Sequence, residues 1–166
     1  MKKAVFDLKS IAVLSAAVLV LTACGGSPPV SIADLPTFAG ATALQPGAST
    51  IATTLKNNET QAAAMGQKIE QKAFQLPKGT AWDAVKGFYT EQLKAKGWNE
   101  GVGGGSGIAG GMAADMANKA LSQANAGNDM FQTAMFSKGK QTLTLMRLAG
   151  TTKKDEVQLL VSLNTR

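Results

Sequence analysis

The stretch KGTAWDAVKGFYTEQLKAKGW, residues 78–98, contains the clearest secondary-structure signal in the chain. Its apolar residues recur every three or four positions, which is the spacing of one face of an amphipathic helix. They are Val85, Phe88, Tyr89 and Leu93, with Trp82 near the start. We predict a helix over residues 80–96, and its apolar face needs a second layer to cover it.

Both ends of this helix are marked in the sequence. Thr80 and Asp83 have the spacing of a capping box, in which each side chain bonds the backbone N–H of the other residue. Gly97 fits the position just after the helix, where the backbone turns left-handed. In that register Leu93 and Trp98 form the hydrophobic pair of a Schellman ending.

The covering layer is predicted to be an antiparallel sheet. QKIEQKAFQL at 67–76 alternates enough to form a strand, and STIATTL at 49–55 is a weaker strand candidate. Three more strands are predicted at 130–137, 141–150 and 157–164. We therefore expect an α+β fold, in which an antiparallel sheet of four to five strands has one main helix packed on one face.

The first residues predict a lipoprotein signal peptide at 1–23. A basic start, MKKAVFDLKS, precedes the apolar run IAVLSAAVLVLTA, which has the length of a signal-peptide core and is short for a bilayer span. The run ends in Leu21-Thr22-Ala23-Cys24, which resembles the lipobox of bacterial lipoproteins. The resemblance implies cleavage between Ala23 and Cys24 and acylation of Cys24 with palmitate-type chains.

An acylated Cys24 would attach the protein to a membrane without a spanning helix, because two or more buried acyl chains hold firmly. Cys24 is the only cysteine, so the chain has no second thiol for an internal disulfide. Gly25 rather than Asp follows it. By resemblance to the sorting pattern of Gram-negative lipoproteins, this implies the outer membrane, facing the periplasm. In a host with a single membrane, the protein would face outward from the cell envelope.

Residues 24–49 are rich in Gly, Ser, Pro and Ala, and we expect this segment, with its acylated Cys, to be a flexible tether. Leu35 and Phe38 within it are apolar enough to dock on the core as an irregular arm. The domain itself is predicted at 50–166, with a Gly/Ala-rich insertion at 103–128.

The insertion contains a G-x-G-x-x-G match at Gly105, Gly107 and Gly110. A dinucleotide site of this type needs a buried strand before the glycines and a parallel β-α-β unit around them. The sequence GWNEGV that precedes them is a poor buried strand, so we expect no nucleotide cofactor.

A second glycine pattern, Gly103, Gly107 and Gly111, forms a small-xxx-small ladder of the type that lets helices approach closely in lipid. It suggests a membrane-contacting or self-associating segment over residues 101–125. The simpler interpretation is a flexible loop followed by a surface helix at 112–127. The apolar stripe of that helix would consist of Met112, Met116, Ala120 and Leu121.

Several motifs together resemble a module of small bacterial envelope lipoproteins of unknown function. In that module a strand ending in LP precedes a helix with FY-x-x-x-L, followed by GW and a hairpin. The matching residues are Leu76-Pro77, Phe88-Tyr89, Leu93 and Gly97-Trp98. LPTFAGA at 35–41 resembles a P-x-Y-P-G-A segment upstream, with Phe38 for Tyr and Ala39 for Pro. The resemblance covers residues 35–100 and the last three strands, implies no catalytic residue, and does not extend to 103–128.

The composition excludes several kinds of active site. The chain has no His, and its one Cys is expected to be acylated, which excludes Ser-His-Asp, Cys-His and Cys/His zinc sites. We predict no catalytic residue, no metal site and no cofactor. A pair of carboxylates stays open, because glycoside hydrolysis needs only two. The candidate carboxylates are Asp83, Glu91, Glu100, Asp115 and Asp129.

The charge pattern bears on the partners. The chain has 17 Lys and Arg residues and 11 Asp and Glu residues, and its bases are scattered rather than gathered into a nucleic-acid stripe. We predict a membrane-anchored, non-enzymatic envelope lipoprotein that binds or assembles with a protein or an envelope polymer. The alternative is a lipid-interacting or self-associating structural lipoprotein acting through residues 101–125, and a carboxylate hydrolase is a third candidate.

Overall fold

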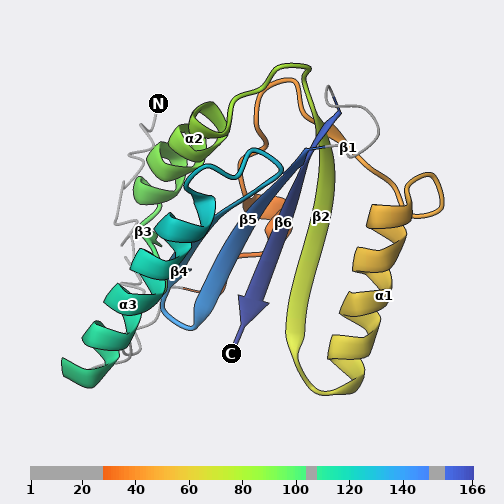
Figure 1. Ribbon diagram of the computed structural model, residues 1–166. Helices are drawn as coiled ribbons and strands as arrows, with labels where there is room; N and C mark the ends of the chain where they lie inside the picture. The colour runs from red at the N-terminus through yellow and green to blue at the C-terminus, as the bar shows by residue number, and fades with distance from the viewer. Residues whose placement is uncertain (1–27, 104–107, 150–155) are drawn as a thin grey trace, which may run out of the picture.

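The computed structural model describes residues 28–103, 108–149 and 156–166 of the chain (Figure 1). The described residues form one antiparallel sheet of six strands in the order β1-β2-β6-β5-β4-β3, with three α-helices. The strands are β1 (Thr42–Ala43), β2 (Lys68–Leu76), β3 (Asn99–Glu100), β4 (Phe131–Lys138), β5 (Gln141–Ala149) and β6 (Val157–Thr165). The helices are α1 (Thr50–Ala64), α2 (Trp82–Lys94) and α3 (Ile108–Asn125), and a short 3-10 helix, η1, spans Ile32–Asp34.

The predicted α+β class is confirmed, and so is the antiparallel meander at the end of the chain, which is β4-β5-β6. The prediction of four to five strands with one main helix is wrong in detail. β1 and β3 are only two residues long, and such short strands leave no periodic signal in a sequence.

The weak strand predicted at 49–55 is instead the first half of α1. Ser49 is the N-cap of this helix, and its side chain accepts from the backbone N–H of Ala52 at 3.4 Å. The threonines that suggested a strand donate their hydroxyls to carbonyls one turn earlier, as Thr53 does to Ser49 at 2.9 Å. Leu55 and Ala62 are buried, so packing against β2 overrides the β-propensity of the threonines.

Helix α2 provides the centre of the core. Val85, Tyr89 and Leu93 are almost completely buried against one face of the sheet. That face comprises alternate residues of four strands, among them Phe74, Leu76, Phe136, Leu143, Leu145, Leu159, Val161 and Leu163. The predicted helix is thus confirmed, although it is shorter than the expected 80–96.

The two predicted ends of α2 have opposite outcomes. The Schellman ending is confirmed: Trp98 N–H donates to the Leu93 carbonyl at 3.0 Å, and Gly97, with φ of +78°, donates to Lys94 at 3.0 Å. The capping box is wrong, because Ala81 is the N-cap and no side chain caps it. Thr80 instead donates its hydroxyl to the Pro77 carbonyl at 2.6 Å, within the preceding turn.

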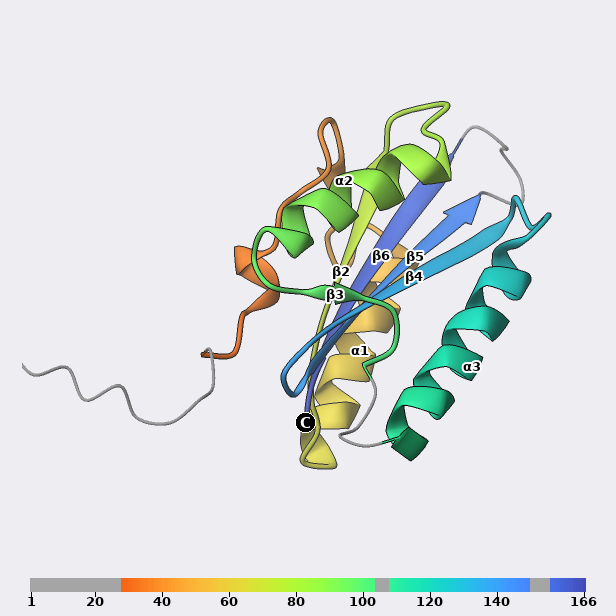
Figure 2. The same cartoon turned by 90° about the vertical axis from the view of Figure 1, so that its left-hand side faces the viewer.

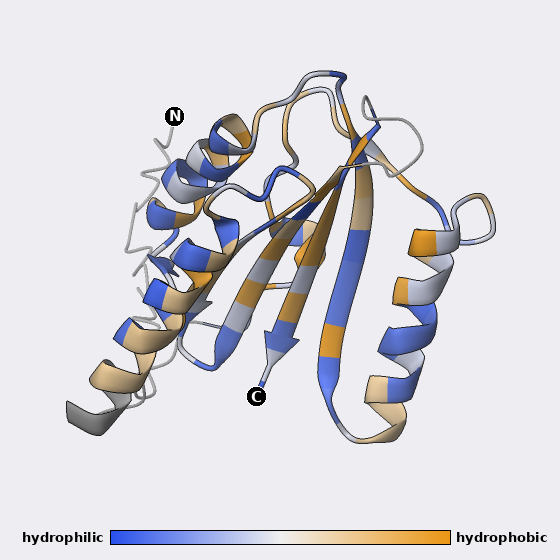
Figure 3. Cartoon of the chain, in the orientation of Figure 1, coloured by the Kyte–Doolittle hydropathy of each residue, from blue (hydrophilic) through white to orange (hydrophobic). Residues whose placement is uncertain are grey.

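The second face of the sheet is flanked rather than covered. Helix α1 packs on β2, and α3 lies along β4, so β5 and β6 lie open between the two helices (Figure 1). Figure 3 shows hydrophobic and hydrophilic residues alternating along β5 and β6. The buried apolar residues of both strands face α2, whereas Met146, Leu148 and Leu160 lie on the open face.

Side chains from the flanking helices pair with backbone groups at both edges of the four long strands. Glu59 of α1 accepts a hydrogen bond from the backbone N–H of Gln71, at the outer edge of β2. Asn125 of α3 bonds Thr133 of β4 twice, accepting from its N–H at 2.8 Å and donating to its carbonyl at 2.6 Å. β1 and β3 pair with two further residues on each of the same edges. Unpaired edges template aggregation, so these contacts protect the sheet.

The predicted helix at 112–127 is confirmed as a helix but lies at 108–125. Its predicted apolar stripe is wrong at Met112, Met116 and Ala120, which are exposed, and only Leu121 of the four is partly buried. Met112 and Met116 are 63% and 73% exposed. Among residues 111–125 of this helix, the less exposed ones are Ala114, Asn118, Leu121 and Asn125. The helix packs through amide hydrogen bonds to β4 and to Val102, a mode of contact that hydrophobic periodicity does not detect.

Replacing Asn125 by Ala tests this edge protection. Asn125→Ala leaves the N–H and C=O of Thr133 unpaired, so we expect a loss of roughly 1–3 kcal/mol in the free energy of unfolding. Amide hydrogen exchange at Thr133 should accelerate. Gln123→Ala, at an exposed position on the same helix, is the matched control. Unchanged exchange at Thr133 in Asn125→Ala would contradict the assignment.

Candidate functional site: the clasp on the N-terminal arm

The segment that would follow an acylated Cys24 is packed on the domain. Residues 28–41 run along the core face of the sheet beside α2 (Figure 2). Leu35 is buried, and the rings of Phe38 and Phe88 meet edge to face at 5.5 Å. The arm predicted from Leu35 and Phe38 is therefore present, and residues 28–49 of the segment expected to be a flexible tether belong to the folded body.

Tyr89 lies where the arm meets α2. Burial raises the pKa of its hydroxyl to about 12, while a backbone hydrogen bond to Phe38 acts in the opposite direction. Tyr89 is therefore neutral at physiological pH and carries no charge into the core. The ring forms part of the surface that the arm covers, together with Phe74 and Val161.

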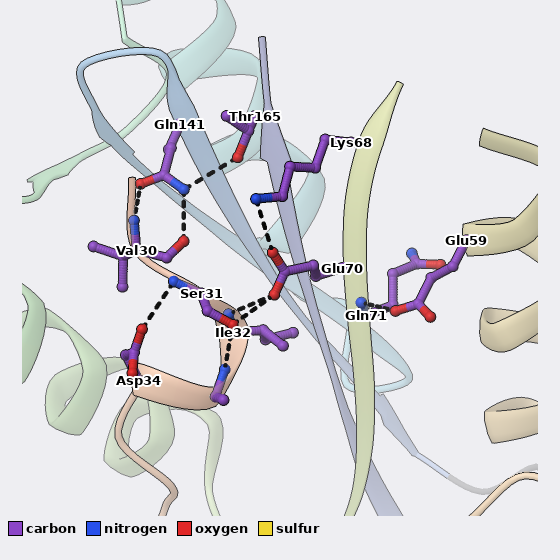
Figure 4. Close-up of polar contacts among 11 residues, drawn as sticks. Val30, Ser31, Ile32, Asp34, Glu59, Lys68, Glu70, Gln71, Gln141 and Thr165 are labelled. Carbon is purple, nitrogen blue, oxygen red and sulfur yellow. Dashed lines mark hydrogen bonds and ion pairs between the residues drawn. The ribbon is translucent and has the colours of Figure 1, made fainter. Parts of the chain in front are cut away.

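The beginning of the arm is held by Gln141, the first residue of β5. Its side-chain oxygen accepts from the N–H of Val30 at 2.8 Å, and its side-chain nitrogen donates to the Val30 carbonyl at 2.7 Å (Figure 4). The same nitrogen donates to the hydroxyl of Thr165 at 3.1 Å. Gln141 is only 5% exposed. Its side-chain amide bonds both backbone groups of Val30, as the backbone of a neighbouring strand would.

A second contact holds the next turn of the arm. One carboxylate oxygen of Glu70 on β2 accepts from the hydroxyl of Ser31 and from the N–H of Ile32, both at 2.9 Å (Figure 4). Lys68 lies 3.7 Å from the other oxygen. Partial burial works to raise the pKa of Glu70, but the hydrogen bonds from Ile32 and Ser31 and the charge of Lys68 outweigh it and lower the pKa. We refer to Gln141, Thr165 and Glu70 as the clasp.

The sequence contains a signal for the clasp that hydrophobic pattern analysis overlooks. Gln141 shares a face of β5 with Leu143, and Glu70 shares a face of β2 with Phe74. A polar residue at a core-facing position needs a partner, because an unpaired buried polar group is costly. The partner here is backbone, as far away in the sequence as 111 residues, so the sequence alone does not identify it.

The predicted lipidation and cleavage residues, Cys24 and Ala23, lie outside the described residues, as does Gly107. Gly103 lies before α3 and Gly111 within it, so the structure does not bring these two onto one helix. A Cβ at Gly103 would come within 2.8 Å of the Ser137 side chain. Gly103 thus allows a close approach to β4 inside the domain, whereas Gly111 has open space around it.

The G-x-G-x-x-G match has no support in the topology. Gly105 and Gly107 lie outside the described residues, and Gly110 belongs to α3. The strand before them, β3, is two residues long and antiparallel to β4. A dinucleotide fingerprint needs a parallel β-α-β unit, and every strand pair described here is antiparallel.

The structure places two of the candidate carboxylates, Glu100 and Asp129, far apart. Glu100 forms an ion pair with Lys86 at 2.7 Å and lies opposite Phe136 on β4. Asp129 precedes the other end of β4, which places the two residues roughly 20 Å apart along the strand at ~3.3 Å per residue. Paired glycosidase carboxylates lie within about 10 Å of each other. The other candidates, Asp83, Glu91 and Asp115, are exposed on helices.

The open face of the sheet is the other surface of interest. On β5 and β6 it presents Thr142, Thr144, Met146, Leu148, Gln158, Leu160, Ser162 and Asn164, all partly exposed. None of these described residues is charged, and most carry an amide or hydroxyl group. Such a surface offers hydrogen bonds and modest apolar contact to a partner without attracting ions.

Comparison with known proteins does not assign a function to these surfaces. No protein-family model, no curated protein and no solved structure matches the chain. Among the described residues, no group of three or more Asp, Glu, His or Cys side chains is placed to hold a metal ion. The helices in the same ranges also include none with the length and apolar character needed to cross a bilayer.

The Gln141 contact predicts how firmly the arm is held. Gln141→Leu keeps the size of the side chain but removes both bonds to Val30, so we expect a loss of about 1–3 kcal/mol in the free energy of unfolding. Amide exchange at Val30 should become faster, and protease should cut the arm before Leu35. Thr142→Val, one residue along on the open face, is the matched control. An arm that stays protected in Gln141→Leu would contradict the clasp.

The Glu70 contact predicts a dependence on pH. Its pKa is lowered in the folded protein, so its stabilising effect is complete above the ordinary value of 4.5 and is lost as the pH falls through the folded-state pKa. Urea unfolding should show the parent to be more stable than Glu70→Gln at pH 7, with the difference shrinking in acid. The exposed position Glu91 supplies the control Glu91→Gln. A difference that is independent of pH would rule out the charged contact.

Proposed function

We propose that the protein is a membrane-anchored, non-enzymatic lipoprotein of the bacterial cell envelope, held by acyl chains on Cys24. The observation that supports this best is the position of the clasp. Val30 is fixed to the sheet only six residues after the lipobox-like cysteine. A lipid anchor there would hold the folded domain at the membrane through a short link, whatever path the residues between them take.

The role we propose for the domain is binding or assembly at that membrane, with a protein or an envelope polymer as partner. The open face of β5 and β6 supports it, because neutral amide and hydroxyl groups suit a contact that is reversible and insensitive to salt. The separation of Glu100 and Asp129 along β4 counts against a carboxylate hydrolase. The resemblance to envelope lipoproteins with an LP, FY-x-x-x-L and GW module agrees with such a role.

Replacing Cys24 tests the anchor directly. In a bacterial host, Cys24→Ser should abolish incorporation of a labelled palmitate analogue and processing to the mature mass, because the thiol that accepts the lipid is gone. Ser27→Ala, three residues along, keeps the cysteine and should be labelled and processed like the parent. Label on Cys24→Ser, or an unlabelled parent chain, would refute the proposal.

The alternative function is a direct lipid contact or self-association through residues 101–125. Its specific support is the exposure of Met112 and Met116, which lie one turn apart on α3. Under this alternative, a chain starting at Gly25 would still bind vesicles, and Met112→Gln with Met116→Gln would weaken that binding several-fold. Met65→Gln, at a methionine that is 70% exposed outside this segment, is the control. Vesicle binding that is absent, or the same in all variants, would exclude this route.

A further inference from the structure

We propose that a basic rim at one end of the sheet docks on the anionic phospholipid headgroups of the leaflet that holds the Cys24 anchor. The rim consists of Lys68, Lys96, Lys138, Lys140 and Arg166. This inference rests on the proposed anchor and adds an orientation to it: the clasped end of the sheet faces the membrane.

The strand register gathers the rim. Lys68 of β2 pairs with Thr165 of β6, Thr165 pairs with Gln141 of β5, and Gln141 pairs with Lys138 of β4. One terminus of each of these four strands therefore lies at the same end of the sheet, which is the lower end in Figure 1. Lys140 lies in the hairpin between β4 and β5, and the backbone N–H of Arg166 donates to its carbonyl at 3.0 Å.

Lys96 joins the rim from the turn after α2. The ammonium group of Lys138 donates to the Lys96 carbonyl at 2.8 Å, and the Lys96 ammonium donates to the Asp34 carbonyl at 3.1 Å. Lys68, Lys96, Lys140 and Arg166 are all exposed, so their charges reach solvent.

The acidic groups at this end are engaged mainly in the arm, and they offset only part of the charge of the rim. Glu70 bonds Ser31 and Ile32 and faces Lys68 at 3.7 Å. The Asp34 carboxylate accepts from the N–H of Ser31 at 3.0 Å. Glu100 also lies at this end, where it lines the same cavity as Lys140 and Arg166, and it forms an ion pair with Lys86 at 2.7 Å. Five basic rim side chains and Lys86 therefore stand against three carboxylates, so the described side chains at this end of the sheet are positive overall.

The opposite end of the sheet has a different charge pattern. Asp129 precedes β4, Glu156 precedes β6, and Asp83 lies in the first turn of α2. The cations described at that end are Lys78, in the turn after β2, and Arg147, which donates to the Asp129 carbonyl at 2.8 Å. Among the described side chains, the clasped end is therefore the more positive of the two, and an anionic surface would attract it more strongly.

The length of chain between the anchor and the clasp brings the rim within range of the headgroups. Residues 24–30 span at most about 20 Å even if fully extended. Val30 is bonded to Gln141, which is adjacent to Lys140 and pairs with Lys138. The screening length is ~10 Å at about 0.1 M salt, and the link is short enough for the rim to come within that distance of the headgroups, where it is attracted to anionic lipid. Each Lys or Arg near such a surface strengthens binding by about fivefold.

Amine footprinting on vesicles tests the docked orientation. The acylated full-length protein is reconstituted on phosphatidylcholine vesicles and on vesicles of two parts phosphatidylcholine to one part phosphatidylglycerol. Binding to both kinds of vesicle reports the anchor. On the anionic vesicles, modification of Lys68 and Lys140 should slow about threefold or more, while Lys56 and Lys119, on α1 and α3, should react at unchanged rates. About 1 M salt should remove the protection, since the screening length falls to ~3 Å.

Two matched triple variants attribute the protection to the rim. Lys68→Gln, Lys140→Gln and Arg166→Gln together should leave Lys96 equally reactive on neutral and anionic vesicles. Lys56→Gln, Lys72→Gln and Lys119→Gln remove the same charge elsewhere and should leave the protection of Lys68 intact.

Three outcomes would overturn the proposal. They are equal reactivity of Lys68 on neutral and anionic vesicles, equal protection of Lys119 and Lys68, and protection of Lys68 by soluble dextran sulfate but not by anionic vesicles. Failure to bind neutral vesicles would refute the anchor and not the rim. The rim is tested on its own by the protection of Lys68 on anionic vesicles.

Discussion

Val85, Tyr89 and Leu93 of α2 meet the sheet where β5 and β6 present Leu143, Leu145 and Leu159, and all six side chains are essentially inaccessible to solvent. Full burial of one such side chain contributes about 1.5–3 kcal/mol. In the part of the chain that the structure describes, no other α-helix covers this face, so the other described elements are arranged around this single contact. The arm covers the part of the face that α2 leaves bare, and the Schellman ending turns the chain so that Trp98 is buried as well.

A sheet covered by one helix on one face has two exposed edges and an uncovered second face. Backbone groups at these edges are hydrogen-bonded by two kinds of partner, short strands and helix side chains. β1 and β3 pair with part of each edge, while Glu59 and Asn125 bond backbone groups further along. Helices α1 and α3 are thus held beside the sheet by polar contacts as well as by apolar ones, which leaves the middle of the second face free for a partner.

The parts that the sequence predicted are those whose burial is periodic. Helix α2, β2 and the β4-β5-β6 meander each repeat their apolar residues at the interval of their own secondary structure. The first half of α1 has the sequence of a weak strand because its threonines favour strands locally, and the packing of Leu55 against β2 makes it helical. The clasp, β1 and β3 depend on partners remote in the sequence, which a local pattern does not encode. Gln141 was detectable as a polar residue on an apolar face, but its partner Val30 was not.

The clasp determines where a force on the short link to the proposed anchor would act on the fold. Gln141 and Thr165 belong to β5 and β6, the two central strands, rather than to an edge. A pull on the chain before Val30 is therefore borne first by side chains fixed in the middle of the sheet, and the arm beyond is held by Glu70 and by the packing of Leu35 and Phe38. Since the arm completes the core, it cannot detach without exposing apolar surface of β2, β6 and α2. An anchor attached to such an arm positions the whole domain, whereas an anchor on a freely jointed tether would fix only its distance from the membrane.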